Sequence, residues 1–502
     1  MWMAVKRGIV VAIGLLIQIL LTLFIYLKFG EFISIIQVVY GLLSIIIVLM
    51  IIKYSKRLSS DLIWILLIML FPLIGTLLYI ILSNNMKRSK VLKNINENIE
   101  NGQKYLIQDE FIKKEIDTKN LGQLKYISEF AGFPVTKNNE INYYSLGDDV
   151  YPVMLEELKK AKKFIFIEYF IINNGTMWQE ILDILKEKAN SGLDVRVLYD
   201  DMGSFAMLPS NYPKLLGKYG IKCMQFNKLS PFAGIIMNNR DHRKMMIIDG
   251  HTAFSGGINI SDEYININSK LGVWKDNGIR IKGEAVWNFT VMFLEMWNSF
   301  KKEDNDYNKY KYNFTEKYKE NGFVVPYGES PLDDVITGED IYLNIINQAK
   351  KYVYIFYTPY LIIDTDMINS LILAARRGVD VRIVVPGIPD KKIVYDLTSS
   401  YFYTLIKGGV KIYTYTNGFV HSKVFLSDDE IATVGTINLD YRSLYLHFEC
   451  GIYMKDTNVI KDIKKDFEDS FKESHKVDEK EAKNGLFKGL WQAILRLFAP
   501  MM

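Results

Sequence analysis

One spacing of polar residues occurs twice in the chain and constrains its fold more than any other feature. The stretch HRKMMIID begins at His242, and HSKVFLSD begins at His421. Both have the spacing His-x-Lys-x4-Asp. The two frames comprise His242, Lys244 and Asp249 in the first copy, and His421, Lys423 and Asp428 in the second. The chain has only 5 histidines, so a repeated frame headed by two of them is not a chance match.

The agreement between the copies extends beyond the aspartate. A glycine and then an asparagine follow each frame at the same distances from the histidine: Gly256 and Asn259 in the first copy, Gly435 and Asn438 in the second. Successive side chains of a β-strand alternate between its faces, so the histidine and lysine of each frame point the same way. One such stretch would also suit an edge strand with solvated polar residues. The duplication instead indicates a paired functional site.

The sequence around the frames also repeats. AKKFIFIEYFII, residues 161–172, resembles AKKYVYIFYTPY, residues 349–360, and ANSGLDVRVLYDD resembles AARRGVDVRIVVP further along. The matching stretches bracket a helix-like segment in each copy, and strands that alternate with helices indicate α/β layers. We therefore expect an α/β fold with two halves, 136–320 and 321–482. Pseudo-twofold symmetry would relate the halves and place the frames opposite each other across their interface.

Three uncharged apolar runs open the chain, at 8–27, 32–52 and 62–82. Each is long enough for a helix that crosses a bilayer, which needs about 20 residues. We expect residues 1–83 to form a transmembrane region with two or three spans, although a cleaved signal peptide is an alternative for the first run. The flanking lysines and arginines are evenly divided, which leaves the orientation open. The polar segment 84–135 is expected to form a charged helical linker.

The carboxyl-terminal stretch NGLFKGLWQAILRLFAPMM has an amphipathic helical pattern. Its apolar residues recur near helical spacing, whereas Lys488, Gln492 and Arg496 follow one another every fourth residue on the other side. A helix within 483–502 would either lie in a membrane interface or pack on the protein's own core. The pattern alone leaves both arrangements open.

The composition limits the classes of function. A net charge of +4 lacks the strongly basic character of a nucleic-acid-binding protein. The two cysteines, Cys223 and Cys450, lie far apart and provide neither a disulfide framework nor a metal-binding motif. Each frame also places a lysine beside its histidine, which opposes the binding of a metal cation. We expect no metal, no other cofactor and no nucleic-acid partner.

Paired histidines and lysines suit the transfer of a phosphorus-centred group. One histidine can attack a phosphorus atom and become covalently modified, while the other protonates the leaving oxygen and later deprotonates the incoming alcohol. The lysines of the frames and the two asparagines, Asn259 and Asn438, can hold phosphate oxygens as charge develops. The glycines that precede these asparagines support the site. Asp249 and Asp428 are expected to brace the frames rather than to transfer protons.

Each histidine also requires an acidic side chain that orients its ring. Asp276, in WKDNGIRI, follows His242 along the chain, and Glu449, in HFECGIY, follows His421. This order pairs each acid with the histidine of its own half.

These features together resemble the phospholipase D superfamily and, within it, the bacterial cardiolipin synthases, over nearly the whole chain. The resemblance is carried by NNRDHRKMMIIDG, FSGGINISDEY, VRVLYDDMGS, YTPYLI, GVDVRIVVPG, GFVHSKVFLSDD, VGTINLDYRS and HFECGIY. One departure is Thr436, where many relatives carry serine. Threonine keeps the hydroxyl group, so the departure does not weaken the resemblance.

The resemblance implies a phosphatidyltransferase that converts two phosphatidylglycerol molecules into cardiolipin and glycerol, without a metal or nucleotide. It implies a multi-pass protein of the bacterial inner membrane whose partners are membrane lipids. By analogy His242 is the nucleophile and His421 the acid/base, and the reverse assignment stays open. A hydrolytic phospholipase D, a phosphatidylserine synthase or a nuclease would use the same residues. The sequence distinguishes neither the acceptor alcohol nor the oligomeric state.

Overall fold

The structure, a computed structural model, describes residues 33–54, 58–83, 90–228, 239–318, 322–333, 335–356 and 359–499. The chain divides into two compact units, Met1–Asn85 and Met86–Met502. Both His-Lys-Asp frames lie in the second, which we call the larger unit.

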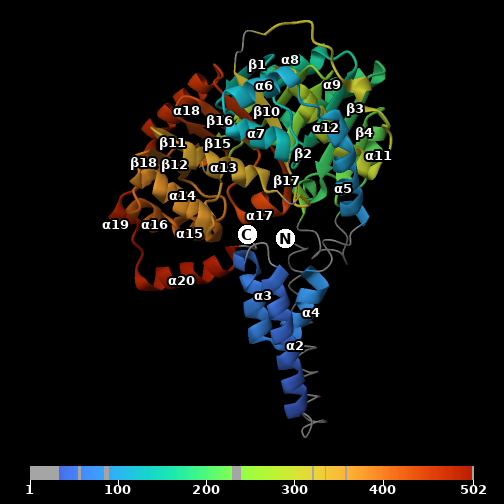
Figure 1. Cartoon of the computed structure of the whole chain (residues 1–502). Helices are drawn as coiled ribbons and strands as arrows, with labels where there is room; N and C mark the ends of the chain where they lie inside the picture. The colour runs from blue at the N-terminus through green and yellow to red at the C-terminus, as the bar shows by residue number, and fades with distance from the viewer. Residues whose placement is uncertain are drawn as a thin grey trace. The chain divides into compact units, whose positions relative to one another are not determined.

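The described helices of the amino-terminal unit are α2 (Ile33–Tyr54), α3 (Leu58–Leu70) and α4 (Pro72–Ser83), as Figure 1 shows. The apolar run 8–27 lies outside the described residues, and the run 32–52 falls almost entirely within α2. The run 62–82 is not a single helix, because it divides at Phe71 between α3 and α4. Proline suits the first position of a helix, where its missing N–H is not needed, so the break at Pro72 has a local cause.

Helices α3 and α4 pack against each other as a short hairpin. The ring centroids of Trp64 and Tyr79 lie 5.7 Å apart across it. A Cβ atom on Gly75 would lie only 2.5 Å from the carbonyl oxygen of Leu67, so this glycine permits the close approach of the two helices. None of the helices in the described ranges combines the length and the apolar sequence that a bilayer crossing requires.

The first half of the larger unit is built on a seven-stranded sheet in the order β1-β9-β7-β6-β2-β3-β4. Its strands are β1 (Asn139–Tyr144), β2 (Phe164–Tyr169), β3 (Asp194–Asp200), β4 (Lys222–Phe226), β6 (Lys244–Ile248), β7 (Thr252–Gly256) and β9 (Gly278–Gly283). Its helices are α8 (Gly147–Lys160), α9 (Thr176–Asn190), α10 (Asp201–Ser204), α11 (Tyr212–Gly217) and α12 (Val286–Phe300). Strands β2, β3 and β4 are parallel, whereas β6 and β7 form the antiparallel pair that carries the first frame.

The second half repeats this order, because β17-β16-β15-β11-β12-β13 corresponds strand for strand to β9-β7-β6-β2-β3-β4. Its strands are β10 (Phe323–Glu329), β11 (Tyr352–Phe356), β12 (Asp380–Pro386), β13 (Lys411–Tyr415), β15 (Val424–Ser427), β16 (Ile431–Gly435), β17 (His447–Lys455) and β18 (Ser474–Lys476). Its helices are α13 (Thr337–Gln348), α14 (Thr365–Arg376), α15 (Lys392–Ser399), α16 (Phe402–Lys407), α17 (Tyr441–Tyr445), α18 (Ile460–Lys472), α19 (Glu479–Ala482) and α20 (Leu486–Leu497). The predicted pair of α/β halves is thus confirmed.

In the segment predicted as a linker, 84–135, the described residues 90–135 are largely helical and pack within the larger unit. The segment contains α5 (Lys90–Gly102), α6 (Glu110–Thr118), α7 (Gly122–Lys125) and two short helical turns, Gln103–Tyr105 and Tyr126–Phe130. Ile95 of α5 is buried in the same hydrophobic cluster as α12, and Ile116 of α6 is buried in the core of the second half. Its regularly spaced isoleucines therefore form an inward face rather than a solvated spacer.

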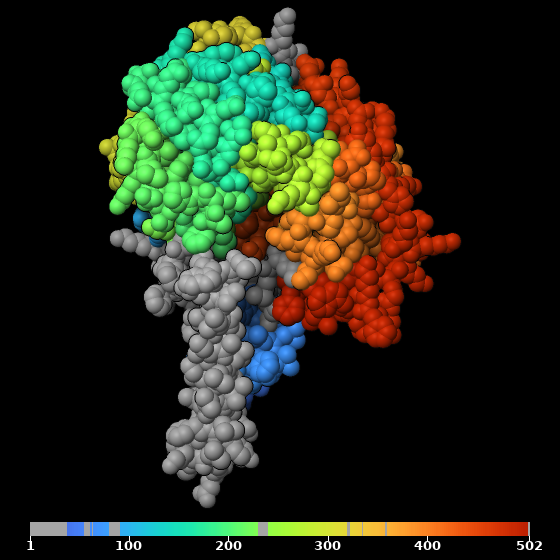
Figure 2. All heavy atoms as spheres, turned by 180° about the vertical axis from the view of Figure 1, so that it is seen from behind, coloured from blue at the N-terminus to red at the C-terminus, as the bar shows by residue number. Residues whose placement is uncertain are grey.

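The two halves share one hydrophobic core. Helix α12 is buried along nearly its whole length, and its cluster includes Phe166 and Ile247 from the first sheet and Leu426 and Ile452 from the second. Figure 2 shows the green first half and the orange-to-red second half lying against each other. Two short parallel strand pairs also join the halves: β5 (Arg240–Asp241) with β17, and β8 (Val273–Lys275) with β14 (Gly418–Val420).

The aspartates of the frames close the turns at the ends of β6 and β15. The Asp249 carboxylate accepts three backbone N–H bonds, from Lys162, Lys163 and Phe164, at 2.7–2.9 Å. Asp428 accepts the equivalent three bonds from residues 350–352, also at 2.7–2.9 Å. Both aspartates adopt left-handed backbone conformations, with φ of 55° and 56°. These contacts fit the bracing role expected for them.

Replacing Asp249 should test this role through stability. Asp249→Ala removes an ionised acceptor of three backbone N–H groups and should lower the free energy of unfolding by about 3 kcal/mol. Asp249→Asn keeps one acceptor oxygen and tolerates the left-handed conformation, so its loss should be clearly smaller. Thermal unfolding of both variants beside the parent chain measures the difference. Equal melting temperatures for parent and Asp249→Ala would contradict the bracing role.

Candidate active site

His242, the histidine of the first frame, is positioned by a strand of the other half. Strand β5 pairs in parallel with the start of β17, with Arg240 opposite His447 and Asp241 opposite Phe448. The backbone N–H of His242 continues this ladder by donating to the Phe448 carbonyl at 2.8 Å. His242 therefore lies beside Glu449, and its Nδ1 is 2.8 and 2.9 Å from the two carboxylate oxygens.

The second histidine is positioned in the same way. Strand β14 pairs in parallel with β8, and the His421 N–H donates to the Lys275 carbonyl at 2.8 Å. His421 Nδ1 then lies 2.7 Å from Asp276 Oδ2. Each histidine is thus paired with the acid of the opposite half, and the same-half pairing expected from the order along the chain is wrong. The cause is that each histidine follows a strand whose parallel neighbour belongs to the other half.

Both imidazoles are held in a dry environment, with exposures of 7% for His242 and 8% for His421. Burial lowers the pKa of His242 to about 3; the charges of Lys244 and His447 add to this, and Glu449 opposes it. Burial and Lys423 lower the pKa of His421 to about 4, against the effect of Asp276. Near pH 7 both rings are neutral, with Nδ1–H donated to the carboxylate and a lone pair on Nε2. Such a ring can act as a nucleophile or a base.

The two lysines are buried beside the histidines. Lys244 is 0% and Lys423 is 3% exposed. The Lys244 ammonium donates to the His242 carbonyl at 2.7 Å, and that of Lys423 donates to the His421 carbonyl. Burial lowers the pKa of Lys244 to about 8, and burial together with the charge of Lys244 lowers the pKa of Lys423 to about 7. The negative charge of an anion bound between the halves, such as a phosphate group, would stabilise the charged forms of both lysines.

The two asparagines occupy different environments. The Asn259 amide is engaged, because Oδ1 accepts from the Ile171 N–H at 3.1 Å and Nδ2 donates to the Tyr264 hydroxyl at 2.7 Å. The buried Oδ1 of Asn438 has no hydrogen-bond partner among the described residues. Asn259 therefore braces the loop after β7, whereas the Oδ1 of Asn438 is free to accept a hydrogen bond from a donor such as an alcohol, and its Nδ2 is the atom that could donate to a phosphate oxygen.

The two glycines permit the close approach of neighbouring strands. Gly256 has a φ of 136°, and a Cβ atom there would lie 2.3 Å from the Asn277 carbonyl oxygen. A Cβ atom on Gly435 would lie 2.6 Å from the Cys450 carbonyl oxygen. Side chains at these positions would displace the strands that carry Asp276 and Glu449.

The residue after each glycine faces the acid of its half. In the first half this residue is Gly257, and a Cβ atom there would lie 2.0 Å from Asp276 Oδ1. In the second half it is Thr436, whose hydroxyl donates to Glu449 Oε2 at 2.5 Å. The hydroxyl of Thr436 therefore fixes the carboxylate that holds His242. The position of Thr436 directly after the repeated glycine is the sequence signal that identifies this residue.

Asp200 is a further residue of the site region that the motif analysis missed. It is fully buried at the end of β3 and accepts from the Arg240 guanidinium at 3.2 Å and from the Asp241 N–H at 3.0 Å. Burial raises the pKa of its carboxyl to about 7, against the effect of Arg240. Asp200 thereby anchors β5, the strand that leads into His242. Asp200 lies in the stretch VRVLYDD, where an aspartate at the end of an apolar strand is the sequence signal that could have identified it.

His447 also lies beside the site, and the motif analysis did not select it. One donor atom each from His242, His447 and Glu449 lie within 4.8 Å of one another, a spacing that a metal ion could use. The positive charge of Lys244 acts on the imidazole of His242 and opposes the binding of a divalent cation there. The arrangement is better suited to an anionic ligand.

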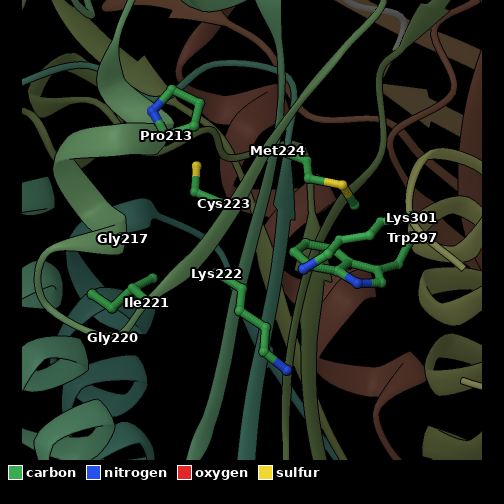
Figure 3. Close-up of a pocket in the computed structure, with 9 residues that line it drawn as sticks. All are labelled: Pro213, Gly217, Gly220, Ile221, Lys222, Cys223, Met224, Trp297 and Lys301. Atoms are coloured by element: carbon green, nitrogen blue, oxygen red, sulfur yellow. The ribbon is translucent and has the colours of Figure 1, made fainter. Parts of the chain in front are cut away.

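A surface cavity of about 230 Å³ lies elsewhere in the first half (Figure 3). It is lined by Pro213, Gly217, Gly220, Ile221, Lys222, Cys223, Met224, Trp297 and Lys301. None of these residues belongs to either frame. The candidate site is therefore defined by the crossed strand pairs and not by this cavity.

Comparisons with known proteins agree with this geometry. The family model described as "Cardiolipin synthase, PLD-like domain" matches residues 154–297 and 342–471, and "Phospholipase_D-nuclease N-terminal" matches residues 42–84. An uncharacterised protein of Streptococcus mutans is 46% identical over 80% of this chain and 87% of its own length. Cardiolipin synthase 1 of Staphylococcus aureus is 35% identical over 82% of this chain and 85% of its own length.

Among solved structures, phosphatidylserine synthase of Haemophilus influenzae has the same fold. It superposes with a TM-score of 0.56 at 15% identity, over 76% of this chain and 98% of its own. Two α/β halves that bring paired His-Lys-Asp frames together define a member of the phospholipase D superfamily. Within it, the chain belongs to the cardiolipin synthases, which are phosphatidyltransferases. This membership implies phospholipid substrates and association with a membrane.

The lysines lead to a prediction for the dependence of activity on pH. Both ammonium groups lose their charge as the pH rises through their lowered pKa values, about 7 for Lys423 and about 8 for Lys244. A neutral amine binds a phosphate oxygen less strongly than an ammonium does, so KM for the lipid should rise over this range. The pH profile of KM and kcat for the full-length chain measures this. A KM that stays constant up to about pH 10, the range of ordinary lysines, would contradict the assignment.

Proposed function

We propose that the chain transfers a phosphatidyl group from one phosphatidylglycerol molecule to another through a phosphohistidine intermediate. The observation that carries this proposal is the crossed pairing, in which each of two buried histidines is oriented by an acid of the other half. Two independent halves could not each complete such a site. The paired histidines therefore act on one substrate at the interface.

The proposed reaction has two balanced steps. The negative charge of the entering phosphodiester favours the protonated form of His421, which takes a proton from solution on Nε2 as the lipid binds. Nε2 of the neutral His242 then attacks phosphorus and breaks the bond to the headgroup oxygen, while His421 gives that oxygen its proton and glycerol leaves. His421 then takes the proton from a hydroxyl of a second phosphatidylglycerol, whose oxygen attacks phosphorus and releases His242. The role of each histidine is assigned by analogy within the superfamily. The ammonium groups of Lys244 and Lys423 and the Nδ2 of Asn438 donate to the phosphate oxygens and stabilise the developing charge.

The chemistry needs no nucleotide, because one phosphodiester is exchanged for another of nearly equal energy. The rings of the two histidines are more than nine-tenths buried, which favours transfer to a lipid alcohol over transfer to water. A wetter site would release phosphatidic acid instead. The ratio of these products therefore separates a synthase from a hydrolase.

The test uses purified full-length protein with phosphatidylglycerol in excess EDTA, and reads the products by mass spectrometry. Cardiolipin and glycerol should appear in equal amounts, with little phosphatidic acid, and added glycerol should reverse the reaction. His242→Ala and His421→Ala should each abolish turnover. His475→Ala, which changes an exposed histidine paired with Glu481, is the matched control and should keep activity. Dominant phosphatidic acid would identify a hydrolase, and a requirement for one divalent metal would contradict the mechanism.

We also propose that the protein is held in a bacterial cell membrane by its amino-terminal helices, as a multi-pass protein. The described part of α2 exposes large apolar side chains along its length, among them Leu42, Ile45 and Leu49 at 58–59%. Exposed apolar surface of this extent is unfavourable in water and suits a lipid environment.

Helix α20 supports a second membrane contact, because its polar side is turned toward the protein. Gln492 donates to the Asp396 carbonyl at 3.0 Å and to the Ser399 hydroxyl at 3.1 Å. The Arg496 guanidinium donates to the Ser400 hydroxyl at 2.9 Å and lies over the Tyr401 ring. A helix packed on its own core normally buries its apolar side. Here the buried Leu495 and the hydrogen bonds of Gln492 and Arg496 hold the helix on the second half, and most of its other apolar side chains point outward.

The outward side of α20 is apolar and large. Leu486, Phe487 and Leu490 are 76%, 87% and 57% exposed, and Trp491, Ile494, Leu497 and Phe498 continue the surface. Lys488 is exposed on the same helix and can contact anionic headgroups. This arrangement suits a helix that lies in the interface of a bilayer.

A fluorescent probe tests this contact. An NBD label on Phe487→Cys, in a Cys223→Ser background, should show blue-shifted emission in proteoliposomes that contain phosphatidylglycerol, because the apolar side enters the acyl region. The matched control is the same label on Asp183→Cys, an exposed position of α9, which should keep the spectrum of a probe in water. Identical spectra at both positions would contradict membrane contact by α20.

A further inference from the structure

A third imidazole lies next to the catalytic His242. His447 is the first residue of β17, and its ring centroid is 5.5 Å from that of His242. It is 8% exposed. Neither of its buried ring nitrogens has a hydrogen-bond partner among the described residues. An unpaired buried polar group is unfavourable, and a ligand is one of the partners that can satisfy it.

The neighbouring carboxylate does not supply the missing partner. His447 Nδ1 is 3.7 Å from Glu449 Oε1, which is too long for a hydrogen bond. The oxygens of Glu449 are already engaged by His242 Nδ1 and by the Thr436 hydroxyl. His447 therefore retains its hydrogen-bonding capacity, although it lies within the buried site.

The register of the crossed strands shows that this position flanks the reaction centre in both halves. His447 precedes the residue that accepts from the His242 N–H, and Trp274 precedes the residue that accepts from the His421 N–H. Trp274 lies 6.0 Å from the His421 ring and packs against Tyr264 and Phe419. It is only partly buried, and it carries a single ring nitrogen, which also lacks a partner among the described residues. The two sides of the site are equivalent in backbone and different in chemistry.

We propose that His447 is a further substrate-binding residue, which donates a ring N–H to an oxygen of the phosphodiester held between His242 and His421. The inference rests on the proposed transfer of a phosphatidyl group. Phosphorus must come within about 3.5 Å of the His242 nitrogen before reaction. The His447 ring centroid is 5.5 Å from that of His242, so a phosphate oxygen on this side would lie near His447. The ammonium groups of Lys244 and Lys423 and the Nδ2 of Asn438 donate to the remaining oxygens.

The phosphodiester suits this position better than an apolar part of the lipid. The ring of His447 adds hydrogen-bonding capacity to a site that already contains two ammonium groups, and an anion is the complementary ligand. A phosphate oxygen can accept several hydrogen bonds, so His447 does not compete with the lysines. Binding would satisfy a ring nitrogen that is otherwise buried without a partner.

The experiment compares the full-length parent with His447→Phe, which keeps a ring without a donor, and with His447→Asn, which keeps an N–H donor. Orthovanadate, a tetrahedral phosphate analogue, is the probe, and its inhibition constant is measured together with kcat/KM for phosphatidylglycerol. His447→Phe should weaken vanadate inhibition and lower kcat/KM by about tenfold or more, as expected for a lost bond to a charged group. His447→Asn should recover part of both. His475→Phe, at the exposed histidine, should change neither.

The outcomes separate this inference from the proposed function. Unchanged vanadate inhibition and kcat/KM in a folded His447→Phe variant would overturn it. Equal losses in His447→Phe and His447→Asn, accompanied by a lowered melting temperature, would assign His447 a packing role and would also overturn it. If the parent chain makes phosphatidic acid instead of cardiolipin, the proposed function fails, whereas vanadate inhibition of that hydrolysis still tests whether His447 binds the anion.

Discussion

The active site depends on two short parallel strand pairs between the halves. Strand β5 lies beside β17, and β14 lies beside β8. Each pair ends where one strand leads into a catalytic histidine and the other into an acid, so the backbone ladder places imidazole and carboxylate side by side. The halves share a hydrophobic core around α12, which keeps the two ladders in register. Separating the halves would remove the orienting acid from both histidines at once.

Burial of this interface determines the chemistry of its side chains. Loss of solvent lowers the pKa values of both histidines and both lysines. Neutral imidazoles therefore lie beside ammonium groups that lose their protons more readily than those of exposed lysines. An entering phosphodiester supplies the negative charge that this arrangement lacks. The same burial limits water, which is the competitor of a lipid alcohol for a phosphohistidine.

The two halves have matching backbones but different side chains at equivalent positions. Gly257 and Thr436 both face an acid, yet only Thr436 gives it a hydrogen bond. Trp274 and His447 both flank a catalytic histidine, yet only His447 has two ring nitrogens for a ligand. The two-step transfer requires histidines with different roles. Different neighbouring side chains in the two halves can give the two histidines those roles. The symmetric fold is therefore a framework for an asymmetric site.

The sequence by itself determined the two halves, the paired frames and the bracing aspartates. The duplicated spacing predicts these features correctly because the strand period and the turns of each half are local properties of the chain. It misassigned the partners of the histidines and gave no sign of His447, because both depend on which strands of different halves become neighbours. It also treated 84–135 as a linker and 62–82 as one helix. The break at Phe71 has a local cause in Pro72, whose signal is already present in the sequence. The inward packing of α5 instead arises from contacts between elements, and only the tertiary structure decides such contacts.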